Sequence, residues 1–267
     1  MHRIKLYVKS LLKIKWTVFV YLFLGLLIFA WLIAIAIAPF NKLKQIQHLT
    51  SADSAFTVGF DSIYFHPDMA NLVKERAYMQ ALLQLSEDDS IQLVVNLSDS
   101  TVNLSMKGII IHQAKISEFT RDKLYDKLSL DQEIKLFSRP LSLQHQYATI
   151  VKEPVVIRQA PKDTMEAALN AWQPDTLIQN PAYASFTFEH NIQLVFEQDE
   201  NKSFRDKWER YRFYSHLKTE KVKTSTTGFF CFRKQEYSPE LTIKIPVDDL
   251  RAIYRALPNH AYVVLKL

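Results

Sequence analysis

A long apolar run lies near the start of the chain, and the spacing of the apolar positions changes several times after it. Trp16 to Ala38 contains 23 residues and no charged side chain. At a rise of about 1.5 Å per residue, a helix of that length spans about 34 Å, enough to cross the hydrocarbon core of a bilayer. The pattern therefore predicts a transmembrane helix over residues 16–38.

The next part of the chain has a helical pattern only after a polar stretch. Residues 41–66 mix polar and apolar positions without a clear period, and we expect a short element around residues 56–65. Pro67 suits the first turn of a helix, and from there to Leu85 the apolar positions recur at helical spacing. A packing arm or stalk helix is the simplest interpretation. Residues 39–89 are therefore predicted to form a stalk and helical linker.

From Ser90 onward, short runs rich in β-branched residues alternate with turn residues, which is typical of β-strands. The predicted strands cover residues 91–97, 101–106, 109–116, 148–158, 183–189, 192–198, 226–232, 241–245 and 261–267. The predicted helices cover residues 161–172 and 246–257, with a short helix near 122–128 and a short amphipathic helix or lid within the charged segment 199–223. The pattern predicts a mainly β domain over residues 90–267, with a sandwich-like or barrel-like architecture and a few short helices.

The charge is concentrated at the N-terminus. Residues 1–15 contain five basic side chains and no acidic one, which equals the net charge of +5 of the whole chain. Residues 41–267 contain 28 basic and 28 acidic side chains and are neutral overall. A nucleic-acid groove needs a surplus of positive charge on the folded domain, so we do not expect DNA or RNA binding.

The same cations set the predicted topology. Five cations precede the apolar run, whereas Lys42 and Lys44 follow it, so the N-terminus should remain cytoplasmic. A cleaved signal peptide is the alternative, because Ala34, Ala36 and Ala38 have the spacing of a cleavage site. The apolar run is longer than a signal peptide needs, which favours an uncleaved anchor. We therefore expect a single-pass protein of a bacterial inner membrane, with its C-terminal domain in the periplasm.

The composition excludes several kinds of site. One cysteine cannot form an intramolecular disulfide or a cysteine-rich metal site, and four glycines include neither of the common glycine-rich phosphate loops. The eight histidines form no H-x-x-x-H pair. His112 is interpreted as a structural residue, and Asp248 and Asp249 as acids of a first helical turn. No metal and no cofactor are expected.

Cys231 is the remaining candidate for chemistry. A nucleophilic thiolate needs a neighbouring base or cation to lower its pKa. His216 precedes the cysteine by 15 residues, and Arg233 would lie on the same face of the predicted strand two residues later. Phenylalanines surround the cysteine in the sequence, which favours an inert residue of a core. Both interpretations of Cys231 remain open at this point.

The order of these segments resembles the catalytic domain of L,D-transpeptidases, the enzymes that cross-link bacterial cell walls. The similar segments are residues 93–111, 180–196, 231–233, 247–254 and 262–265. The family places His and Gly immediately before its catalytic cysteine, whereas Phe229 and Phe230 stand there in this chain. The histidine that precedes the cysteine in the family has a counterpart only in His216, which Leu217 follows. The resemblance therefore implies a transpeptidase-type domain whose reaction has been lost.

Three functions follow from these observations. The first is an inactive transpeptidase-like domain that binds peptidoglycan or an envelope partner protein in a cleft between residues 183–198 and the Cys231 strand. The second is an active cysteine transpeptidase, in which Cys231 is the nucleophile, His216 the general base and Arg233 a substrate or structural partner. The third is a scaffold subunit of a secretion or motility complex.

Overall fold

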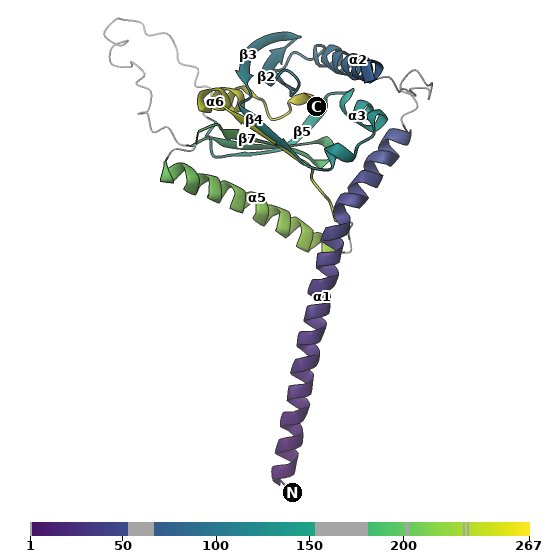
Figure 1. Cartoon of the computed structure of the whole chain (residues 1–267). Helices are drawn as coiled ribbons and strands as arrows, with labels where there is room; N and C mark the ends of the chain where they lie inside the picture. Colours follow the sequence, from purple (N-terminus) through teal and green to yellow (C-terminus); the bar gives the residue numbers. More distant parts are fainter. Residues whose placement is uncertain (1, 53–66, 153–180, 201–202, 232, 234) are drawn as a thin grey trace, which may run out of the picture. The chain divides into compact units, whose positions relative to one another are not determined.

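The computed structural model describes residues 2–52, 67–152, 181–200, 203–231, 233 and 235–267 (Figure 1). They form two compact units, one that joins Met1–Leu49 with Leu217–Tyr237 and one that joins Thr50–His216 with Ser238–Leu267. The described part contains five α-helices and one mixed sheet of nine strands. The fold is thus mixed α/β. The predicted fold class is confirmed in part: a β-sheet domain with helices follows a long apolar N-terminal helix, but the class is mixed α/β and the strands form one sheet instead of a sandwich.

The apolar run lies within the helix α1 (His2–Ala52), which extends well beyond both ends of the predicted span. Its apolar side chains are exposed: Leu22 and Phe29, for example, are 67% and 64% exposed. Pro39 lies inside the helix, where it removes one main-chain N–H donor. The buried positions Ala38, Lys42 and Ile46 follow at four-residue spacing. One face of α1 is therefore covered just beyond the apolar run, within the unit that also contains Leu217–Tyr237.

The nine strands belong to the other unit and have the spatial order β3-β2-β1-β9-β5-β6-β7-β8-β4. In chain order they are β1 (Gln92–Asn96), β2 (Thr101–Met106), β3 (Ile109–Lys115), β4 (Glu118–Arg121), β5 (Leu141–Ala148), β6 (Tyr183–Phe188), β7 (Ile192–Gln198), β8 (Glu240–Ile245) and β9 (Tyr262–Lys266). The β1–β9 and β7–β8 pairs are parallel, and the other pairs are antiparallel. Both parallel pairs join strands that are far apart in the sequence.

The sheet curls strongly, because its two end strands are consecutive in the chain. Only Ile116 and Ser117 separate β3 from β4. The N–H of Ile116 donates to Ser100 O at 2.8 Å, and the N–H of Ser117 donates to Lys244 O at 2.9 Å. Consecutive residues therefore bond to opposite ends of the strand order, which requires those ends to lie close together.

Helices cover both faces of the central strands. The helix α6 (Val247–Ala256) packs against β3, β6 and β7, and the ring of Tyr254 lies 6.0 Å from that of Phe186. On the other face of β6, Tyr183 stacks on Phe213 of the helix α5 (Phe204–Phe230) with ring centroids 5.6 Å apart. Alternate residues of a strand point to opposite faces. Every residue of β7 is buried for this reason.

Two further helices pack beside β9. These are α2 (Pro67–Leu85) and α3 (Leu130–Phe137), which contact each other as well as β9. Ala81 and Leu85 of α2 form a buried apolar cluster with Val94 and Val264. The start of α3 is fixed by Ser129, whose hydroxyl accepts from Gln132 N while the Gln132 side chain accepts from Ser129 N.

Most of the predicted elements in the described regions are confirmed. The helices at 67–85 and 246–257 and the strands at 91–97, 101–106, 109–116, 183–189, 192–198, 241–245 and 261–267 correspond to α2, α6, β1, β2, β3, β6, β7, β8 and β9. The short helix near 122–128 corresponds to the 3-10 turn Tyr125–Lys127. The strand predicted at 148–158 was wrong over residues 149–152, because β5 ends at Ala148. The rest of that strand and the elements predicted at 56–65 and 161–172 lie outside the described residues.

The helix expected within the charged segment 199–223 is present, but it is longer than predicted, and the strand expected at 226–232 was wrong. Residues 226–230 belong to the same helix, α5, which begins at Phe204 and continues to Phe230. Thr226, Phe229 and Phe230 are residues that favour strands in isolation. Helix propagation costs little once a nucleus exists, so a helix that begins at Phe204 can continue through them.

Candidate functional site

The structure does not bring the predicted catalytic residues together. His216 lies in the middle of α5, and its ring stacks on Tyr147 of β5 at 4.1 Å. Cys231 is exposed and directly follows the same helix, 15 residues later. At a rise of about 1.5 Å per residue, 15 residues of helix correspond to about 22 Å. His216 therefore cannot act as the base for Cys231 in this structure.

The third predicted site residue has a main-chain role in this structure. The N–H of Arg233 donates to Gly228 O at 2.8 Å, which caps the end of α5. The strand that was to form one side of the predicted cleft is not found among the described residues, because Cys231 directly follows a helix and belongs to none of the nine strands. The prediction of a core position for Cys231 was wrong as well, since the residue is exposed.

The interpretations of the other candidate residues fit the structure. His112 of β3 lies with Nε2 3.0 Å from Asp249 Oδ1, which connects the edge of the sheet with the first turn of α6. Asp248, in the same turn, pairs with Arg251 at 3.2 Å. Among the described residues, no cluster of three or more His, Cys, Asp or Glu side chains could hold a metal ion.

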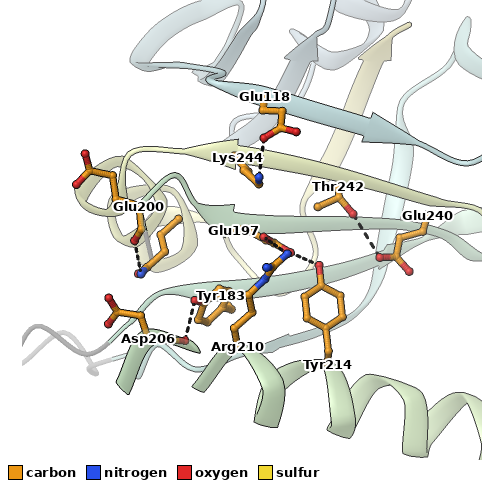
Figure 2. Close-up of polar contacts among 11 residues, drawn as sticks. Glu118, Tyr183, Glu197, Glu200, Asp206, Arg210, Tyr214, Glu240, Thr242 and Lys244 are labelled. Carbon is orange, nitrogen blue, oxygen red and sulfur yellow. Dashed lines mark hydrogen bonds and ion pairs between the residues drawn. The ribbon is translucent and has the colours of Figure 1, made fainter. Parts of the chain in front are cut away.

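A buried charge cluster connects α5 with the sheet (Figure 2). The Glu197 side chain near the end of β7 is completely buried. Arg210 Nη2 lies 3.2 Å from Oε1 and 3.1 Å from Oε2 of this carboxylate, and the Tyr214 hydroxyl donates to Oε1. Arg210 and Tyr214 are one turn apart on α5, so both reach the same carboxylate. A buried carboxylate with two such partners is a structural anchor for the helix.

The tyrosines around this carboxylate are held in their neutral form. Burial, and then the hydrogen bond to Glu197, raises the pKa of Tyr214 far above its ordinary value. Burial, and then the charge of Glu197, raises the pKa of Tyr183 in the same direction. The Tyr183 hydroxyl donates to Asp206 O at 3.2 Å, which fixes the first turn of α5 to β6. These phenols are hydrogen-bond donors at neutral pH, and none is set up to act as a base.

An open pocket of about 260 Å³, lined by polar and apolar residues alike, lies between α2, α3 and the end of β9. Four charged side chains line it in two pairs. Lys74 Nζ lies 2.7 Å from Glu133 Oε2, which connects α2 with α3, and Lys266 Nζ pairs with Glu75. The two glutamates differ in exposure, with the Glu133 side chain 19% and the Glu75 side chain 43% exposed. The pocket therefore presents both signs of charge to a ligand.

An aromatic side chain completes this pocket. Lys266 Nζ lies 5.1 Å from the centroid of the Tyr78 ring, within the range of a cation–π contact. Burial raises the pKa of Tyr78 above its ordinary value, and the charges of Glu75 and Asp99 act in the same direction against a hydrogen bond with Asn96. The lining thus offers cations, carboxylates and a neutral phenol, and it includes no thiol or imidazole. Such a lining suits the binding of a small ligand with opposite charges.

Neither cluster can be predicted from a local sequence pattern. The pocket lysines Lys74 and Lys266 are nearly 200 positions apart, and each looks like an ordinary surface residue. Glu197 stands near the end of the predicted strand 192–198, where a charged side chain is ordinarily exposed. Its burial depends on the elements that cover both faces of β7, and that covering is visible only in the structure.

Comparison of the chain with models of protein families, with curated proteins and with solved structures gave no significant match.

Proposed function

We propose that this chain is a single-pass protein of a bacterial cytoplasmic membrane whose α/β unit lies in the periplasm and binds a short zwitterionic peptide of the cell envelope without turnover. The stem peptide of peptidoglycan is the first ligand to test, because it carries both amino and carboxyl groups. The lining of the pocket by two lysines and two glutamates carries this proposal. A ligand that carries both an ammonium and a carboxylate group can form ion pairs with these lysines and glutamates, in place of the pairs Lys74–Glu133 and Lys266–Glu75.

The membrane part of the proposal rests on α1. Within this helix, Val18–Leu49 contains an 18-residue apolar window with a mean hydropathy of 2.8, and no residue of that window is buried against the rest of the described chain. Side chains of this kind are stable in lipid and costly in water. The preceding five cations support a cytoplasmic N-terminus.

The absence of turnover rests on the separation of Cys231 from His216 along α5 and on the composition of the pocket lining. The resemblance to L,D-transpeptidases supports only the choice of a peptidoglycan peptide as the ligand. This ligand does not follow from the fold, and a binding experiment tests it.

Titration of the detergent-solubilised chain with a synthetic stem tetrapeptide tests the proposal. We expect saturable binding that Lys74→Ala and Lys266→Ala each weaken about tenfold, since a charge-assisted hydrogen bond contributes about 1.5–3 kcal/mol. Lys123→Ala, which removes an exposed lysine outside the pocket, is the matched control. Thermal unfolding shows whether each variant is folded. Absence of binding, or equal binding by all three variants, would refute the peptide site.

A scaffold role is the second candidate, and one feature of β3 favours it. Ile109, Ile110 and Ile111 are 70%, 57% and 52% exposed on the strand that begins the described strand order. Exposed apolar strands at a sheet edge are sites where another chain can add a strand. Photo-crosslinking in cells distinguishes this role: a crosslinker at Ile111 should give one discrete adduct, and one at Tyr211, which is 67% exposed on α5, should give none.

A further inference from the structure

The end of α5 forms a tight reversal with an aromatic tip. Cys231 N donates to Thr227 O at 3.0 Å. The Gln235 side chain then bonds back to Ser225: its Oε1 accepts from the Ser225 hydroxyl at 2.7 Å, and its Nε2 donates to Ser225 O at 2.9 Å. The chain therefore turns back along the helix within a few residues. Phe230 is 69% exposed at the tip, and its ring lies 5.9 Å from that of Phe229.

This tip belongs to the same compact unit as α1. Lys42 is only 4% exposed, and its Nζ lies 3.5 Å from Gln45 Oε1. Burial lowers the pKa of Lys42, and the charge of Glu236, which lies near this ammonium group, acts in the opposite direction. Lys42 comes four residues after Ala38, about 6 Å along a helix. Glu236, in the segment that follows the tip, therefore lies near the end of the apolar run.

The position matters because the polar interface of a bilayer begins where the apolar run ends. Each interface is about 5–8 Å thick, the difference between a hydrocarbon core of about 30 Å and a total thickness of about 40–45 Å. Phe230 is six residues from Glu236, so the tip is within reach of that interface. Aromatic side chains are favoured at this depth.

The last turns of α5 before the tip have the charge that an anionic lipid surface attracts. These turns contain three lysines, Lys218, Lys221 and Lys223, and one acidic residue, Glu220. Val222, between two of the lysines, is 52% exposed. The whole of α5 contains seven Lys and Arg side chains and three Asp and Glu, whereas residues 41–267 are neutral overall. Cations beside exposed apolar side chains are characteristic of helices that lie in a membrane interface.

We propose that the tip of α5, residues Phe229–Cys231, inserts into the membrane interface next to α1 and is a second lipid contact of this chain, with the lysines of the preceding turns at the phosphate groups. This inference rests on the proposed membrane anchor. The anchor already holds the tip near the bilayer, so the contact is effectively intramolecular and needs little affinity of its own. It fixes the last turns of α5 against the membrane surface.

The lone cysteine permits a direct test with the full chain. An environment-sensitive fluorophore is attached to Cys231, and the protein is reconstituted in vesicles of phosphatidylcholine with a minority of phosphatidylglycerol. Lipids with a quencher near the headgroup should reduce the emission at least about twofold more than aqueous iodide does, as expected for a residue about 5–10 Å deep in the interface. Phe230→Ser should abolish this difference.

Phe204→Ser is the matched control, because it removes an aromatic side chain that is 82% exposed at the opposite end of the same helix. It should leave the quenching unchanged. If the protein floats with the vesicles but the label is quenched only by iodide, the anchor stands and the tip contact is refuted. Equal loss of lipid quenching in both variants also refutes it. If the protein fails to float with the vesicles after alkaline extraction, the anchor itself is refuted, and the tip contact with it.

Discussion

Glu197 lies where water does not reach, on the face of β7 that α5 covers. The two members of the ion pair differ in exposure: the Glu197 side chain is 0% exposed, whereas the Arg210 side chain is 46% exposed. If the carboxylate is removed, the arginine can turn toward solvent. If the arginine is removed, the carboxylate remains buried with the Tyr214 hydroxyl as its main remaining partner. Removal of the Arg210 side chain should therefore lower the free energy of unfolding more than removal of the charge of Glu197.

We predict that Arg210→Met costs about 3 kcal/mol of unfolding free energy, because it leaves a buried charge without its counter-ion. Glu197→Gln should cost about 1 kcal/mol, since the amide oxygen can still accept from Tyr214. Chemical denaturation of the solubilised chain measures both values. The double variant should recover part of the loss of Arg210→Met, and a larger cost for Glu197→Gln than for Arg210→Met would contradict this account.

Single residues were also where sequence reasoning was weakest. Asp248 and Asp249 were correctly assigned to the first turn of a helix, because that assignment depends only on their neighbours in the chain. Glu197, Arg210 and Tyr214 were not connected, because their proximity depends on how α5 folds back over β6 and β7. The catalytic interpretation of Cys231 assumed a strand that the preceding helix overrides.

At the scale of the element, Phe213 is the buried aromatic side chain through which α5 packs on the sheet. Phe213 is 1% exposed and stacks at 5.6 Å on both Tyr147 and Tyr183. Two turns of the helix around it also hold Arg210 and Tyr214 against Glu197. Loss of this aromatic contact should loosen the first half of α5 as a unit.

We predict that Phe213→Ala costs about 3–5 kcal/mol, the usual range for truncation of a buried phenylalanine. Tyr211→Ala, two residues away and 67% exposed, should change the unfolding free energy by less than about 0.5 kcal/mol. Proteolysis adds a second readout, because the released helix should be cut in Phe213→Ala and resist in Tyr211→Ala. Equal stability of the two variants would show that α5 is held by other contacts.

The elements that could be predicted are those whose signals are local. The strands at residues 101–106 and 192–198 are bounded by turn residues, and α2 begins at a proline. The helix α3 was missed although Ser129 and Gln132 form a capping box, because only eight residues follow the cap. The sandwich class failed for a different reason: parallel pairing of β1 with β9 and of β7 with β8 joins segments that no local pattern relates.

At the scale of the whole molecule, several buried tyrosines make the stability depend on alkaline pH. Burial raises the pKa of Tyr183, Tyr214, Tyr78 and Tyr254 above the ordinary value of 10.0. The folded chain keeps these protons when the unfolded chain has begun to release them. Their contribution to stability is therefore present in full below about pH 10 and is lost as the pH rises above it.

We predict that the unfolding free energy falls steeply between about pH 9.5 and about pH 11.5, with each such tyrosine contributing up to about 1.4 kcal/mol per pH unit. Tyr214→Phe removes one of these protons, so its stability should be lower than that of the parent at neutral pH but should fall less steeply in alkali. The exposed Tyr211→Phe serves as the control and should follow the parent curve. Other groups that titrate in this range are common to all three proteins, so the difference between the slopes isolates Tyr214. Parallel plots of unfolding free energy against pH for Tyr214→Phe and the parent would contradict this prediction. They would mean that the Tyr214 hydroxyl has the same pKa in the folded and the unfolded chain.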